Sequence, residues 1–193
     1  MKAGVDHVVF MSSARTRDVE EPGVWASYFA GEQRLMQTAA KWSILRMNYY
    51  AEALLQEVPG ALASGVLTGL AENSLAFVSR ADIAAAAAGL LTGFGHEGAI
   101  YSATGPASLS GAERAALISK ASDKPVGFMT LSEAQLRGAM EPMGYPADVV
   151  NVVISIQKGF SAGGFDIVTG DVEMLSGQAP RPLDDILAAS MPA

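Results

Sequence analysis

The segment Trp42–Leu55, WSILRMNYYAEALL, constrains the fold more than any other stretch of the chain. It begins as an apolar run of strand length and continues as an amphipathic helix, so it predicts a strand that turns directly into a helix. A second apolar run, His7–Met11 (HVVFM), ends at Ser12-Ser13 and is typical of a parallel strand buried on both faces. Helical spacing over Trp25–Ala40 separates the two runs. This strand–helix–strand order predicts an α/β fold with a parallel sheet.

The second half of the chain reads as mostly helical. Two capping boxes, Ser110 with Glu113 and Ser132 with Gln135, predict two helix starts there. Earlier, alternation over Ala99–Ala103 predicts a further strand. We therefore expect two domains, an α/β part over residues 1–108 and a small, mostly helical lobe over residues 109–193.

Two helix boundaries in the first part follow from local signals. The helix that starts at Ala51 is expected to be interrupted at Pro59-Gly60, because proline cannot donate the helical hydrogen bond. Asp82 is expected to be the N-cap of the alanine-rich helix Ile83–Leu91.

Charge and composition exclude several function classes. The net charge of −7 and the pI near 4.8 argue against nucleic acid and anionic membranes as partners. The chain has no cysteine, which excludes disulfide and thiolate chemistry, and the histidines His7 and His96 lie too far apart in sequence to predict a zinc site. We see no secretory signal and no apolar segment of the roughly 20 residues that span a bilayer, so the protein is predicted to be cytoplasmic.

The best-placed polar and aromatic cluster is Asn48–Glu52. Ligands of α/β proteins bind outside the carboxyl ends of parallel strands, and this cluster follows such an end. Two interpretations remain open. The cluster is either a ligand-binding corner, or a plain strand-to-helix turn with a tyrosine in the core and Glu52 in solvent.

Five segments taken together resemble the NmrA-like family, which are atypical short-chain dehydrogenase/reductases. They are GVDHVVFMSS, WSILRMNYYAEALL, SRADIAAAAAGLL, GHEGAIYSATG and FSAGGFDIVTGDVEMLSGQAPRPLDDIL. The resemblance implies a Rossmann-like sheet that binds NADP (or NAD) and a C-terminal lobe over the substrate cleft. It also implies an NAD(P)H-dependent oxidoreductase that reduces a quinone or a similar carbonyl acceptor.

The same resemblance implies roles for individual residues. Those expected to bind the cofactor are Arg46, Asn48, Tyr49, Tyr50, Ala51 and Glu52, and those in catalytic positions are Ser12, Ser13 and Tyr28. The Tyr-x-x-x-Lys pair of the superfamily is half present, since Tyr28 precedes Glu32 and not a lysine, which puts proton transfer by a tyrosinate in doubt. From the residues alone, Ser12-Ser13 also reads as a polar strand end, Tyr28 as a packing residue and Arg46 as the partner of an acidic neighbour.

The glycine-rich loop of the family has no counterpart in these 193 residues. The glycines of GFGHEG follow a helix and precede a strand, which is the wrong order for a loop that holds a diphosphate. The resemblance therefore implies a truncated form that opens at the family's fourth strand, and weak or lost cofactor binding. We expect self-association through the exposed edge of His7–Met11, or marginal stability. A non-catalytic module that senses dinucleotide redox state and binds a protein partner is the alternative function.

Overall fold

The computed structural model describes residues 4–17 and 24–191. Within them, β1 (Val8–Ser13), β2 (Trp42–Met47) and β5 (Ala99–Ala103) form a parallel sheet in the order β1-β2-β5. Ser13 lies opposite Met47, which in turn lies opposite Ala103, so the three strands end together at one edge. The expected α/β class with a parallel sheet is confirmed, and the runs HVVFM and WSILRM lie in neighbouring parallel strands.

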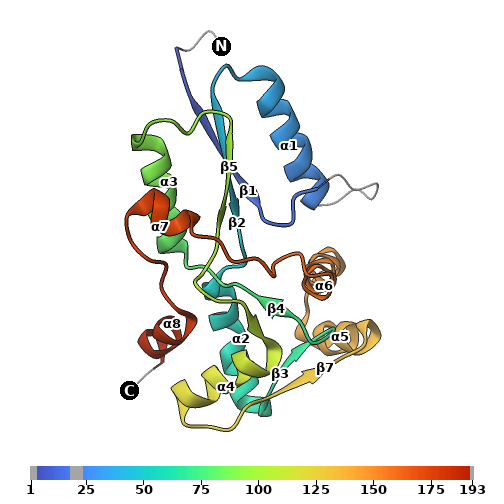
Figure 1. Ribbon diagram of the computed structural model, residues 1–193. Coiled ribbons are helices and arrows are strands. Elements are labelled where there is room, and N and C mark those ends of the chain that lie inside the picture. The colour runs from blue at the N-terminus through green and yellow to red at the C-terminus, as the bar shows by residue number, and fades with distance from the viewer. Residues whose placement is uncertain (1–3, 18–23, 192–193) are drawn as a thin grey trace.

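Helices cover this sheet from two sides (Figure 1). Helix α1 (Val24–Thr38) contacts β1 and β2, whereas α3 (Arg80–Thr92) packs beside β5 together with α7 (Asp171–Ser176). The C-terminal segment thus returns to the first sheet. Helix α3 and α7 approach so closely that a Cβ on Gly89 would collide with the backbone of Leu175.

The remaining elements build the lower half of Figure 1. Strand β3 pairs in parallel with β7, and β4 pairs antiparallel with β6. Both pairs join a segment before residue 100 to one after it, so the two halves of the chain interlock. The elements are α2 (Ala51–Ser64), β3 (Val66–Gly69), β4 (Ser74–Leu75), β6 (Leu109–Ser110), α4 (Gly111–Ser122), β7 (Gly127–Thr130), α5 (Glu133–Met140), the 3-10 turn η1 (Glu141–Met143), α6 (Ala147–Ser161) and α8 (Leu183–Ser190).

Two clusters of buried apolar side chains hold these layers together. One lies between the sheet, α3 and α7 and contains Leu45, Val78, Ile83, Ala86, Leu90, Ala103, Val172 and Leu175. The larger one joins α2, α4 and α8 and includes Leu54, Val58, Leu67, Phe77, Ile118, Phe160, Phe165 and Leu187. The larger cluster draws on both sides of residue 108, and the domain boundary expected there stays a prediction.

Two expected helix boundaries are wrong. Helix α2 continues through Pro59 to Ser64, because Leu54, Val58 and Ala61 bury one apolar stripe that holds the helix on both sides of the proline. The cap of α3 is Ser79, whose hydroxyl accepts from the Asp82 amide, so Asp82 lies one turn inside the helix. Both capping boxes of the second half are confirmed.

Candidate functional site

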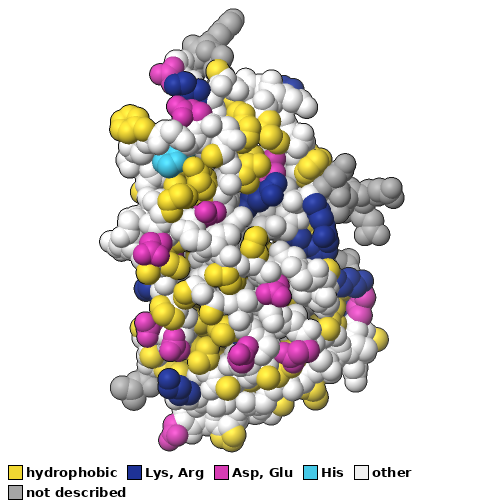
Figure 2. Space-filling view, in the orientation of Figure 1, with side chains coloured by type: hydrophobic (Ala, Val, Ile, Leu, Met, Phe, Trp, Pro, Cys, Tyr) yellow, Lys and Arg dark blue, Asp and Glu magenta, His cyan; other side chains and the backbone are white. Residues whose placement is uncertain are grey.

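The carboxyl edge of the sheet is where a ligand crevice is expected in this architecture. It is formed by the ends of β1, β2 and β5 and by the start of α2. On the face shown in Figure 2, Lys and Arg side chains gather near the end of β1, while acidic side chains are scattered over the lower part. The local charge around this edge therefore differs from the acidic balance of the whole chain.

The two serines at the end of β1 lie inside the protein. Ser12 is fully buried, and its Oγ lies 2.9 Å from Oγ1 of Thr16. The same Thr16 oxygen accepts the backbone N–H of Ser13 at 3.3 Å. Thr16 thus satisfies both residues locally and fixes the turn after the strand. Catalytic roles for Ser12 and Ser13 stay predictions.

Glu32 occupies the position of the superfamily lysine and is bound to Arg46 of β2. The guanidinium donates from Nε to Oε1 at 2.9 Å and from Nη2 to Oε2 at 2.6 Å, so the contact is bidentate. The Glu32 side chain is 1% exposed and that of Arg46 is 28% exposed. The hydrogen bond to Glu32 raises the pKa of the Arg46 guanidinium. Arg46 thus has the acidic neighbour that one interpretation of the sequence expected, and a contact with the cofactor stays a prediction.

Tyr28 lies one helical turn before Glu32 and close to Tyr50. Desolvation of the Tyr50 phenol raises its pKa, the nearby Tyr28 adds to the effect, and Arg80 opposes it. Tyr50 donates its hydroxyl to the sulfur of Met47 at 3.2 Å, and the Arg80 guanidinium lies 5.5 Å from its ring centroid. Tyr28 and Tyr50 are thus neighbouring, partly exposed phenols near the carboxyl edge of the sheet.

Asn48 connects the end of β2 to the C-terminal segment. Its amide nitrogen donates to the carbonyl oxygens of Phe165 at 3.1 Å and Ile167 at 3.3 Å. Its side-chain oxygen accepts the backbone N–H of Tyr49 at 2.8 Å. Asn48 is 3% exposed, so it acts inside the protein as the anchor of the segment 165–167.

The adjacent tyrosines separate to opposite sides of the chain. Tyr50 packs against the cluster beneath the sheet, whereas Tyr49 enters the larger cluster and meets the rings of Phe77, Phe160 and Phe165 edge-on. Its centroid lies 4.7 Å from that of Phe160. Burial of the Tyr49 phenol, together with the charge of Glu57, raises its pKa to about 12, so it stays neutral at ordinary pH.

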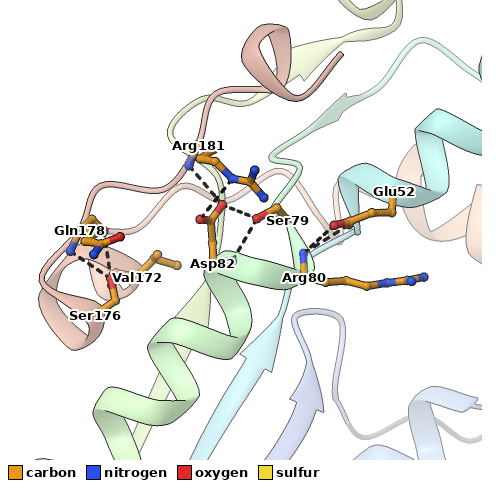
Figure 3. A network of polar contacts seen from close by, with 8 residues as sticks. All are labelled: Glu52, Ser79, Arg80, Asp82, Val172, Ser176, Gln178 and Arg181. Atoms are coloured by element: carbon orange, nitrogen blue, oxygen red, sulfur yellow. Dashed lines mark hydrogen bonds and ion pairs between the residues drawn. The ribbon is translucent and has the colours of Figure 1, made fainter. Parts of the chain in front are cut away.

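The start of α2 is fastened to the start of α3. Ala51 is fully buried and donates its amide to the Val78 carbonyl oxygen at 3.0 Å. The Glu52 carboxylate accepts the Arg80 amide at 3.0 and 3.2 Å, which places a negative charge at a helix N-terminus (Figure 3). Of the six residues predicted to bind the cofactor, Arg46, Tyr50 and Glu52 stay partly exposed, Asn48 and Ala51 are buried, and Tyr49 packs into the larger cluster on the other side of the chain. Their roles in cofactor binding stay predictions.

A separate polar network fastens the C-terminal tail to α3 (Figure 3). Asp82 accepts hydrogen bonds from the Ser79 hydroxyl at 2.6 Å and from the Arg181 amide at 3.1 Å. The Arg181 side chain lies 3.8 Å from the same carboxylate. These contacts fix the tail that follows α7 and thereby the segment held by Asn48.

Arg15 was not singled out by the sequence, although it follows the two serines directly. Its Nη1 donates to the Ser155 carbonyl oxygen of α6 at 3.2 Å, and its guanidinium lies 5.5 Å from the Trp25 ring centroid. The side chain fills the space that a Cβ on Gly159 or Gly164 would occupy. Gly159 and Gly164, on either side of Ser161, were the sequence signal for this close approach. Arg15 thus connects the end of β1 to α6.

Two absences concern the described residues alone. In residues 4–17 and 24–191, no cluster of three or more His, Asp or Glu side chains has the geometry of a metal site. No helix within the same ranges has both the length and the apolar character needed to cross a bilayer.

No protein-family model matches the chain. Curated relatives include quinone oxidoreductase 2 of Escherichia coli, 32% identical over 163 residues that make up 84% of this chain and 57% of the relative. The NAD(P)H azoreductase of Xenophilus azovorans is also 32% identical, over 86% of this chain and 60% of the relative. The chain therefore spans less than two thirds of the length of these two relatives.

Solved structures agree with these relatives. The NADPH complex of the Escherichia coli quinone oxidoreductase superposes with a TM-score of 0.88 at 29% identity, over 97% of this chain and 66% of the other. NmrA, a negative transcriptional regulator solved with NAD, shares the fold alone, with a TM-score of 0.72 at 14% identity. With its relatives, its parallel sheet and its strand-end corner, the chain belongs to the NmrA-like family of atypical short-chain dehydrogenase/reductases.

Proposed function

We propose that the protein is an NAD(P)H-dependent oxidoreductase that transfers a hydride to a quinone or a similar carbonyl acceptor. The observation that carries the proposal is the strand-end corner, in which the Tyr50 ring lies beside the Arg80 guanidinium and close to Tyr28. Two relatives that match most of this chain are named as a quinone oxidoreductase and an NAD(P)H azoreductase, which supports the same reaction class.

The residues at the corner suit the nicotinamide end of a dinucleotide. Tyr28 and Tyr50 are hydrogen-bonding aromatic groups that can flank a ring, and desolvation raises the pKa of the Tyr50 phenol. A bound reduced dinucleotide would supply the hydride. The residues of the chain then position the acceptor, exclude water and hold protons, and Asn48 fixes the segment 165–167 beside the end of β2.

The diphosphate end has no matching cradle in this sequence. A loop of the type G-x-x-G-x-x-G supplies backbone amides at a helix N-terminus, and no such loop follows a strand in these 193 residues. We therefore propose that this chain binds the cofactor weakly. Calorimetric titration with NADPH measures this directly, and tight binding to the 193-residue chain would refute it.

Turnover is tested by NADPH consumption with a panel of quinones, at cofactor concentrations raised until the rate saturates. The proposal expects oxidation that depends on both the quinone and the protein. Saturable NADPH binding without turnover of any acceptor would refute the enzymatic proposal. It would favour the redox-sensing alternative, which fits the replacement of the superfamily lysine by a buried Glu32.

We also propose that the chain associates through the outer edge of β1. Among the described residues β1 has a ladder partner on one side alone, and its first four residues are apolar. Light scattering should show species larger than 20.0 kDa. A monodisperse monomer over a wide concentration range would contradict this.

A further inference from the structure

Arg15, just past the end of β1, is a cation without a carboxylate partner. Among the side chains that the structure describes, neither Arg15 nor Arg17 belongs to an ion pair. Burial and the neighbouring charge of Arg17 lower the pKa of the Arg15 guanidinium. By contrast, Arg46 at the end of β2 is paired with Glu32. Two unpaired cations side by side, in a chain with a net charge of −7, favour an anion at this place.

The Arg15 side chain is held in position by its surroundings. Its Nη1 donates to the Ser155 carbonyl oxygen at 3.2 Å, and the guanidinium lies 5.5 Å from the Trp25 ring centroid. The side chain also fills the space that a Cβ on Gly159 or Gly164 would occupy. A free arginine loses conformational entropy when it binds a ligand, whereas a side chain fixed in this way has already lost much of it. Arg15 is therefore pre-organised for binding.

Most of the hydrogen-bonding capacity of this group is unused. An arginine carries five N–H donors, and the bond to Ser155 is the one that the guanidinium makes with a described residue. The Nε–H of Arg15 and the indole Nε1–H of Trp25 are both buried without an acceptor, which is rare in folded proteins. Arg15 as a whole is half-buried, so an oxyanion from solvent can reach the remaining donors of the guanidinium.

A series of contacts connects Arg15 to the strand-end corner. The Ala14 amide donates to the Met47 carbonyl oxygen at 2.9 Å, so Arg15 follows directly after the last residue that lies beside the end of β2. The Trp25 ring meets the Phe165 ring edge-on, with 5.7 Å between the centroids. Phe165 belongs to the segment 165–167, which is itself anchored at the end of β2. The guanidinium thus lies beside the place proposed for the reacting groups.

We propose that Arg15 binds an acidic group, a carboxylate or a sulfonate, on the acceptor that enters this corner. The inference rests on the proposed function and names the acceptor class as an aromatic quinone with an acidic substituent. Trp25 packs against the larger cluster and Tyr50 against the cluster beneath the sheet, so Arg15 and Tyr50 approach the corner from different sides. The planar guanidinium would orient the acceptor through its acidic group. Arg15 is a positioning residue and takes no part in hydride or proton transfer.

The first measurement needs no turnover. Calorimetric titration with naphthalene sulfonate, an aromatic anion that cannot accept a hydride, should show saturable binding to the wild type. Arg15→Met keeps the apolar stem and should weaken this binding about 10-fold or more, the scale of a hydrogen bond to a charged group. Binding of the neutral naphthalene sulfonamide should be the same in both proteins. Arg15→Lys keeps the charge without the planar fork and should recover part of the affinity.

The second measurement is NADPH-dependent turnover with a matched pair of acceptors. In Arg15→Met the KM for a naphthoquinone sulfonate should rise about 10-fold, whereas kcat and the KM for the parent naphthoquinone stay at their wild-type values. A merely structural role of Arg15 would impair both acceptors alike. Weaker NADPH binding in Arg15→Met, with an unchanged KM for the sulfonate, would assign the anion to the cofactor and overturn the proposal.

The matched control is Arg34→Met, which removes the same charge from an exposed arginine on α1. It should leave sulfonate binding and both KM values unchanged. Equal weakening of sulfonate binding in Arg15→Met and Arg34→Met would overturn the site, because a general loss of positive charge would then explain the result.

Two outcomes in the wild type separate this proposal from the proposed function. If the wild type binds no sulfonate, the site is overturned, since Arg15 would then be neutralised within the chain, for instance by an acid of the segment 18–21, outside the described residues. If sulfonate binds through Arg15 but no quinone is reduced, the proposed function is refuted. The assignment of the anion to an acceptor falls with it, while the anion site itself stands on the first measurement.

Discussion

The Glu32–Arg46 pair offers the sharpest test of how the first layer is held together. In Arg46→Met the apolar stem is kept and the charge is removed, which leaves a carboxylate that is 1% exposed without its bidentate partner. Removing one member of a buried pair costs about 3–5 kcal/mol. We expect about 3 kcal/mol, the lower end, because Arg46 is 28% exposed and water can reach the vacated side.

The measurement is urea unfolding at pH 8 and pH 5, with calorimetry for the midpoint. At pH 8 the loss corresponds to a fall in Tm of roughly 6–12 °C for a chain of this size. The unpaired Glu32 carboxyl group favours its protonated form, so the stability deficit should shrink at pH 5. A double variant, Glu32→Leu with Arg46→Met, should recover most of the loss, since no charge is left buried.

The matched control is the exposed pair Lys41–Glu97, whose side chains are 55% and 45% exposed at 3.5 Å. Lys41→Met should cost less than about 1 kcal/mol, as exposed pairs do. The reasoning fails if Arg46→Met costs no more than Lys41→Met, or if its deficit is equal at both pH values. Either result would mean that Glu32 does not depend on Arg46 for its burial.

Four further substitutions, one of them a control, test other parts of the fold. Asn48→Ala should lower the free energy of unfolding by about 1–3 kcal/mol in urea titrations, because it leaves the carbonyl oxygens of Phe165 and Ile167 unpaired. An unchanged unfolding midpoint would contradict the role of Asn48 as the anchor of the segment 165–167. Gly89→Ala should lower the free energy of unfolding by about 1–3 kcal/mol or more, because the new Cβ collides with the Leu175 backbone. The control Gly60→Ala, inside α2, meets nothing within 4 Å and should raise the free energy of unfolding by about 0.5–1 kcal/mol, so equal effects of the two variants would exclude a close α3–α7 contact. The folded wild type favours the protonated Glu57 carboxyl group, so its free energy of unfolding should fall as pH rises from about 4.5 to about 7. Glu57→Gln should not show this fall, and parallel curves of stability against pH for the two proteins would exclude the raised pKa.

The sequence was sufficient for the elements whose signals are local. The apolar runs gave β1 and β2, and Trp42–Met47 matches the strand at both ends. The capping boxes at Ser110 and Ser132 depend on contacts three residues apart, so they could be read directly. Pro59 was misjudged because propensity is a weak local term, and burial of Leu54, Val58 and Ala61 outweighs it.

The sequence also placed Asn48–Glu52 at a strand end, but it could not show what each side chain contacts. The Asn48 side chain donates hydrogen bonds to the carbonyl oxygens of Phe165 and Ile167, more than 100 positions along the chain. The Glu52 carboxylate accepts a hydrogen bond from the backbone N–H of Arg80.

The small pocket that Glu57 lines with Thr68, Arg114 and Gln157 was beyond any reading of the sequence. Its residues come from α2, β3, α4 and α6, and no periodicity or spacing relates positions so far apart. Composition, apolar period and capping chemistry act over a few residues, and they determined the strands, the helices and the family resemblance. The surroundings of a titratable group depend on every segment packed around it, so the raised pKa values of Tyr49 and Glu57 were decided by the tertiary structure alone.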